Sequence, residues 1–130
     1  MDEVNKTSLL WASFKGHETV VRLLLTADNV DIESKTIDRQ ISLSCASEFG
    51  FNAVVKLLLQ NKADVNSIDS GGKTSLTHAA EKGHEAVVKC LIAEDNVNVN
   101  VVDRNGKTPL TYAFWKGHKV IVKLLESVVI

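Results

Sequence analysis

The sequence predicts an all-α fold: an α-solenoid of stacked helix–turn–helix units joined by short β-hairpin arms. The first observation is a glycine that recurs at positions 16, 50, 83 and 117. The second is a triplet of Thr-Ser-Leu, Ile-Ser-Leu or Thr-Pro-Leu that always begins nine residues before that glycine. We therefore expect one domain over residues 1–130, with repeats at about 2–35, 36–68, 69–102 and 103–130, the last of them truncated.

The third copy shows why each unit begins with a turn and a short helix. Gly71 and Gly72 follow Asp69, and paired glycines supply positive φ without a Cβ penalty. Thr74 stands where a helix N-cap belongs, since its hydroxyl can accept an N–H of the first turn. The pattern then predicts a helix over residues 75–82, ended by Gly83 in the left-handed region.

A second helix and an extended arm complete the unit. Residues 85–93 carry apolar side chains on one face of a 3.6-residue period, which predicts an antiparallel partner for the first helix. Residues 95–102 then alternate valine with asparagine, and this period of two predicts a hairpin arm.

Charge and composition narrow the class of function. Lys and Arg number 15 against 16 Asp and Glu, a net of −1, and no stretch gathers five or six like charges, so we do not expect nucleic acid as a partner. No apolar run approaches 18 residues, so no membrane span is predicted. Two cysteines, Cys45 and Cys90, and an N-terminus without a signal pattern predict a reducing intracellular setting, the cytoplasm or the nucleus.

Several motifs resemble those of the ankyrin repeat. They are Thr108-Pro109-Leu110, Ala79-Ala80, Gly-His at 16, 83 and 117, and Ala63-Asp64-Val65-Asn66. The resemblance covers nearly the whole chain, and the extra residue in copies one and three is similar to the 34-residue variant of long fungal arrays. It implies a scaffold that binds a protein or peptide, without catalysis, cofactor or metal.

Copy two departs most from this pattern. Ile41-Ser42 replaces Thr-Pro, Phe51 replaces the histidine after Gly50, and Arg39 stands where Gly72 and Gly106 supply a turn. Because arginine does not adopt positive φ cheaply, we expect that turn to be rebuilt or softer than its neighbours.

Both terminal repeats carry apolar residues where a solenoid usually presents a polar cap. The first helix of copy one contains Leu9, Leu10 and Trp11, and the last helix leads into Val128-Val129-Ile130. We expect the chain to be a segment of a longer array. The alternative is that its uncapped terminal repeats associate end to end with a second copy.

The resemblance places partner contacts on the concave face of the first helices and at the hairpin tips. All seven aromatic residues fall on or just after a first helix, and aromatic side chains often anchor interfaces. The alternative is that this stripe is packed between repeats, as we expect for Phe114. The candidate contact residues are Trp11, Phe14, Lys15, Ile37, Glu48, Phe49, His78, Glu81, Lys82, Arg104, Tyr112, Trp115 and Lys116.

Two other kinds of function are weighed against binding. Cys45 and His78 share a register in adjacent first helices, but neighbouring helices lie about 10 Å apart and no acid or oxyanion motif accompanies the pair, so we predict no catalytic site. The histidines after the glycines are held apart by the repeat, so we predict no zinc site. Asn66 resembles the acceptor of asparaginyl hydroxylases; alternatively, its side chain braces the hairpin. A purely structural spacer also remains an alternative.

Overall fold

The computed structural model describes residues 17–19, 23, 42–61 and 63–128, and all regular structure within these ranges is helical. Residues 42–49 form a helix, and five more helices follow along the chain. They are α4 (Asn52–Gln60), α5 (Ser75–Lys82), α6 (Glu85–Ile92), α7 (Pro109–Lys116) and α8 (Lys119–Val128). The predicted all-α stack is confirmed.

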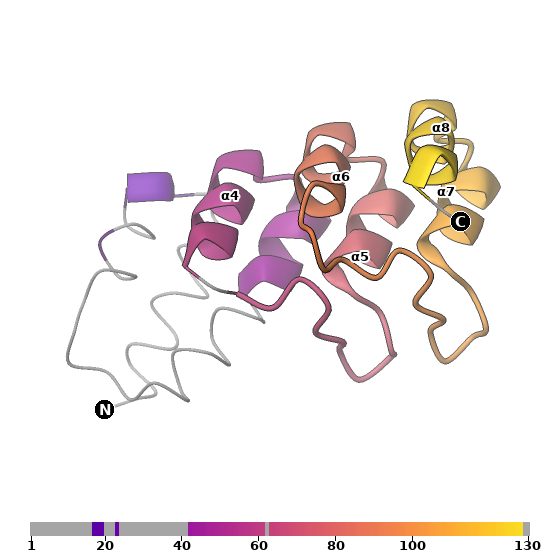
Figure 1. Cartoon of the computed structure of the whole chain (residues 1–130), viewed down its shortest axis with the longest axis horizontal. Coiled ribbons are helices and arrows are strands. Elements are labelled where there is room, and N and C mark those ends of the chain that lie inside the picture. Colours follow the sequence, from indigo (N-terminus) through magenta and orange to yellow (C-terminus); the bar gives the residue numbers. More distant parts are fainter. Residues whose placement is uncertain (1–16, 20–22, 24–41, 62, 129–130) are drawn as a thin grey trace.

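The helices form two rows (Figure 1). The helix at 42–49, α5 and α7 make the first row, and α4, α6 and α8 make the second. Within the rows, α5 packs on α7, and α6 packs on both α4 and α8. The connecting arms extend from the helices on one side of the stack.

Local capping explains where the first helices begin and end. The Thr77 N–H donates to the Thr74 hydroxyl at 3.2 Å, and the Thr74 N–H donates to the Thr77 hydroxyl at 3.3 Å. Gly83 ends α5 in the left-handed region at φ 82°. At α7 the Thr108 hydroxyl likewise accepts the Thr111 N–H at 3.2 Å, and Gly117 ends the helix in the left-handed region at φ 79°. The predicted first helix is confirmed, while α6 ends one residue before the predicted position 93.

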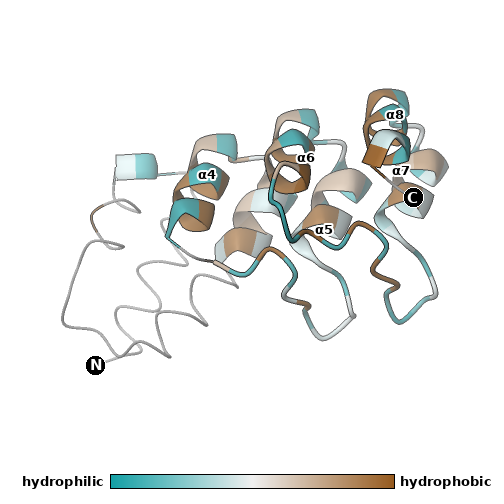
Figure 2. Cartoon of the chain, in the orientation of Figure 1, coloured by the Kyte–Doolittle hydropathy of each residue, from teal (hydrophilic) through white to brown (hydrophobic). Residues whose placement is uncertain are grey.

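The core lies between the two rows and between successive repeats. Figure 2 shows the second helices with apolar residues along one side and polar residues along the other. Ala79 and Ala80 of α5 are fully buried, and their small side chains let α7 approach closely. The largest fully buried aliphatic side chains are Leu43, Val54, Val55, Leu58, Leu76, Val87, Val88, Leu91, Ile121 and Leu125.

The arms end in tight turns, and no residue in the described ranges forms a strand. In the last arm the Asp103 N–H donates to the Lys107 carbonyl at 2.9 Å, and the Gly106 N–H donates to the Asp103 carbonyl at 3.0 Å. Of the glycine pair in copy three, Gly72 takes positive φ at 79°. The turn expected at Arg39 lies outside the described residues.

Candidate binding surface

Two aspartates at equivalent positions organise the arms beside the first helices. Asp103 accepts the N–H groups of Asn105 (2.9 Å) and Lys107 (3.0 Å) on one carboxylate oxygen and the Tyr112 hydroxyl (2.5 Å) on the other. In copy three, Asp69 accepts the N–H groups of Gly71 and Lys73 on one carboxylate oxygen, and its other oxygen bonds to the ring of His78. Each carboxylate therefore closes its own turn and also fixes a side chain of the helix that follows.

These contacts move the pKa values of the groups involved. The hydrogen bond from Tyr112 is the largest cause that lowers the pKa of Asp103, and the N–H groups of Lys107 and Asn105 add to it. The same bond raises the pKa of the Tyr112 phenol. Partial burial acts to raise the pKa of Asp69, but bonds from Lys73, His78 and Gly71 outweigh it and the pKa is lowered. Both carboxylates are therefore held in the charged form.

Two lysines of the arms reach over the first helices. The Lys73 ammonium lies 3.0 Å from a Glu81 carboxylate oxygen and 4.8 Å from the centre of the Tyr112 ring in the next repeat. Trp115 occupies the register of Glu81 one repeat later, and the Lys107 ammonium lies 3.6 Å from the centre of its ring. Repeat three therefore presents an ion pair where repeat four presents a cation on an aromatic face.

The Gly-His pairs join successive first helices. The His84 ring donates from Nε2 to the Glu48 carbonyl at 2.8 Å, and the His118 ring donates to the Glu81 carbonyl at 3.1 Å. A Cβ built on Gly83 would lie 2.7 Å from the His118 ring. The glycine of one repeat thus leaves space for the histidine of the next.

Most described contact candidates remain at the surface. Phe49 is 44% exposed and Trp115 is 64% exposed, and Lys82, Arg104 and Lys116 are also exposed. Glu48, His78 and Glu81 are half-buried, the last two through their bonds to Asp69 and Lys73. The candidates outside the described residues are Trp11, Phe14, Lys15 and Ile37.

Two aromatic residues of α7 differ from expectation. Tyr112, expected as an exposed contact, is only 4% exposed because its ring is covered and its hydroxyl is bonded to Asp103. Phe114, expected between repeats, is 77% exposed because no described residue covers that side of α7. The exposed aromatic surface of repeat four is therefore formed by Trp115 and Phe114.

Asn66 braces the arms in the way the structural alternative predicts. Its side-chain amide donates to the Asn96 carbonyl at 2.7 Å, and its side-chain oxygen accepts the Asn98 N–H at 2.7 Å. One asparagine thus links two successive arms through both of its polar atoms.

Cys45 and His78, which were weighed as a catalytic pair, each interact with other groups. Burial raises the pKa of the Cys45 thiol, with the charge of Glu48 adding to the shift, and His78 is bonded to Asp69. No group of three potential metal ligands is found among the described residues, and no described helix is long and apolar enough to cross a membrane. The sequence did not predict that Asp69 and Asp103 bond to the first helices, although both occupy the first position of a turn in the same register.

Comparison with known proteins agrees with this geometry. A family model described as ankyrin repeats, three copies, matches residues 43–128, and a single ankyrin repeat model matches residues 5–37. An ankyrin repeat and KH domain-containing protein of Caenorhabditis briggsae is 42% identical over 92 residues, which are 68% of this chain and 3% of that protein. The mask protein of the same description in Drosophila melanogaster is 38% identical over 72% of this chain and 2% of its own length.

A relative of another kind is the serine/threonine-protein kinase VIK of Arabidopsis thaliana. It is 38% identical over 77 residues, 58% of this chain and 18% of the kinase. The chain thus spans a small part of the relatives it matches. The chain belongs to the ankyrin repeat family, as shown by the family matches together with the recurring triplet and glycine and the two rows of helices.

Proposed function

We propose that this chain is a non-catalytic binding module that holds a protein or peptide on the first-helix row and the arm tips. Ankyrin repeats are general protein-interaction modules, and the relatives are ankyrin repeat proteins. The observation that carries the proposal is the Trp115 ring, 64% exposed and held under Lys107 at 3.6 Å. A rigid exposed indole costs little entropy to bury, so it suits an interface anchor.

The surroundings of Trp115 suit a partner with mixed chemistry. The ion pair of Lys73 and Glu81 lies one repeat away, and Lys82 and Lys116 are exposed at the ends of their helices. Phe49 supplies a second exposed ring on the first-helix row, stacked on Phe51 with ring centres 6.2 Å apart. We infer that apolar side chains of the partner bind at the two rings and polar ones at the charged rim.

Photo-cross-linking tests where the partner binds. A cross-linking residue at position 82, on the first-helix row, should capture a partner from cell extract, while one at position 89, exposed on α6, should not. Equal capture at both positions would contradict binding on the first-helix row.

Truncation of the rings tests their role in affinity. We expect Trp115→Ala to weaken partner binding about 30-fold, since anchor residues contribute about 2 kcal/mol or more. The matched control is Val120→Ala, which truncates an apolar residue of α8 that is 47% exposed. A structural spacer without a dedicated partner would show no specific capture and no difference between the variants, whereas equal melting temperatures would exclude loss of folding.

A further inference from the structure

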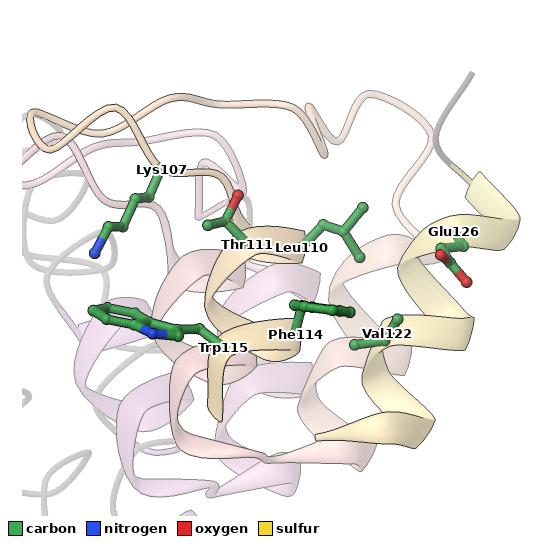
Figure 3. A pocket seen from close by; sticks show the side chains of 7 residues that line it. All are labelled: Lys107, Leu110, Thr111, Phe114, Trp115, Val122 and Glu126. Atoms are coloured by element: carbon green, nitrogen blue, oxygen red, sulfur yellow. The ribbon is translucent and has the colours of Figure 1, made fainter. Parts of the chain in front are cut away.

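The side of α7 and α8 that faces away from α5 and α6 carries an open apolar pocket. Its volume is about 490 Å³. Figure 3 shows Leu110, Phe114 and Val122 in the middle, Lys107 and Trp115 at one edge and Glu126 at the other. We call these six residues the α7–α8 outer face. An exposed apolar patch with a charged rim is typical of a protein contact surface.

The equivalent face of repeat three is the one on which repeat four stacks. Leu76, Ala80 and Val88 occupy the positions of Leu110, Phe114 and Val122 one repeat earlier, and each is fully buried under α7 and α8. A further repeat at the same spacing would meet the Phe114 ring where α7 meets only the methyl group of Ala80. The outer face is therefore poorly shaped for another repeat in regular stacking.

The side chains at the two edges of this face lie at two heights along the α7 axis. Because α8 follows α7 after the short turn at Gly117 and packs antiparallel to it, the end of α8 lies beside the start of α7. Glu126 is thus level with Lys107. Lys119, seven residues and about 10 Å earlier on α8, is level with Trp115.

A twofold axis parallel to α7 would place each of these side chains opposite a side chain of complementary chemistry in the second copy. Such an axis, running through Leu110 and Phe114, leaves every residue at the same height along α7. It places the α7 edge of one copy against the α8 edge of the other. It brings Lys107 against Glu126 of the second copy, and Trp115 against Lys119 of the second copy. Each contact occurs twice: the first is an ion pair and the second a cation on a ring.

We propose that two copies of this chain associate through the α7–α8 outer face about this twofold axis. Phe114 lies at the centre of the contact, where the two rings cover each other. Lys123, which borders an adjoining hollow of about 330 Å³ with Lys119, stays hydrated at the rim. The proposal concerns the pure protein and is tested without the partner proposed above. Because both contacts use Trp115, a partner bound at this ring would compete with the second copy.

Sedimentation of the purified chain tests the association. We expect a concentration-dependent dimer for the native chain and a dissociation constant at least about tenfold higher for Phe114→Ala, since a central ring is lost. Because Phe114 is 77% exposed, the melting temperature of the monomer should not fall. A native chain that remains monomeric up to about 1 mM, or a dimer unaffected by Phe114→Ala, would overturn the proposal.

Charge reversal tests the twofold geometry. Lys107→Glu places two glutamates together in each pair, and Glu126→Lys places two lysines together, so each variant alone should dimerise more weakly than the native chain at low salt. A mixture of the two variants restores both opposite-charge pairs and should form a mixed dimer with near-native affinity. Lys89→Glu on α6 is the matched control. A mixture that associates no better than either variant alone would overturn the geometry.

Discussion

Single carboxylates determine how the arms meet the helices. Asp103 holds a turn through two backbone N–H groups and holds the next helix through the Tyr112 hydroxyl. Asp69 repeats the arrangement with His78 in place of the tyrosine. A carboxylate accepts on both of its oxygens, whereas an asparagine has one acceptor oxygen and an NH2 group that can only donate, so asparagine cannot accept the same set of hydrogen bonds.

Asp103→Asn is expected to lower the free energy of unfolding at neutral pH by about 1–3 kcal/mol, as for loss of charged hydrogen bonds at a buried group. The folded-state pKa of Asp103 is lowered from 3.8, so the contribution is present above about pH 4 and is lost as pH falls through the folded-state value. Urea unfolding near pH 7 and near pH 3 measures this, and the difference in stability between the native and variant proteins should be smaller at the lower pH.

The exposed Asp95→Asn is the matched control for this experiment and should change little at either pH. A difference between native and Asp103→Asn proteins of the same size at both pH values would show that the carboxylate charge is not what stabilises the turn.

Successive first helices are joined where a glycine of one repeat meets a histidine of the next. Gly83 combines a left-handed φ of 82° with the close ring of His118, so both backbone conformation and space exclude a side chain. The histidine ring in turn donates to the carbonyl of Glu81, near the end of α5. One short contact thus satisfies a helix terminus and sets the spacing of neighbouring repeats.

Gly83→Ala is expected to destabilise the protein by about 1–3 kcal/mol, because alanine is strained at positive φ and its Cβ displaces the His118 ring. In a His118→Ala background the steric part disappears, so the effect of Gly83→Ala should be smaller by about 0.5 kcal/mol or more. Thermal and urea unfolding of the four proteins measure this coupling.

Gly71→Ala provides the comparison, since a Cβ there meets only an Asp69 oxygen at 3.4 Å. Equal losses at Gly71 and Gly83, or strict additivity of the Gly83 and His118 substitutions, would contradict the contact as described.

Local signals predicted the helices well, and contacts between repeats were predicted less well. Thr74 and Gly83 act within their own helix, so their roles as cap and stop could be inferred from neighbouring residues. Tyr112 and Trp115 lie on one helix and are both aromatic, yet one is buried and the other exposed. What separates them is their contacts with the folded arm: the Tyr112 hydroxyl bonds to Asp103, and the Lys107 ammonium lies on the Trp115 ring. Asp103 and Lys107 recur in register as Asp69 and Lys73, but the sequence period does not show which side chains of the helix they contact.

Among the helices that the structure describes, the extensive contacts are those between neighbouring elements. Helix α6 packs on α4 and α8, and α5 packs on α7, so the third repeat links the second to the fourth. In such an array, stability is a sum of terms for each repeat and each interface. A destabilising substitution in the third repeat should therefore also lower the stability of the second and fourth repeats.

Leu91→Ala tests this coupling, since Leu91 is fully buried on α6. We expect a loss of about 2–5 kcal/mol from the cavity. Amide hydrogen exchange should become faster in α4 and α8 as well as in α6. Val120→Ala, at an exposed position of α8, should leave exchange in α4 unchanged. Faster exchange confined to α6 would indicate that the repeats unfold independently.

The glycine–histidine contact also bears on how such a gene can lengthen. The third repeat carries Gly83 for its successor and His84 for its predecessor, so a tandem duplicate of this segment would bring both halves of the junction with it. Its small Ala80 leaves room for whatever follows. The fourth repeat has the histidine and the glycine but places Phe114 in that space, so a duplication of it would need a compensating substitution before the new unit could dock.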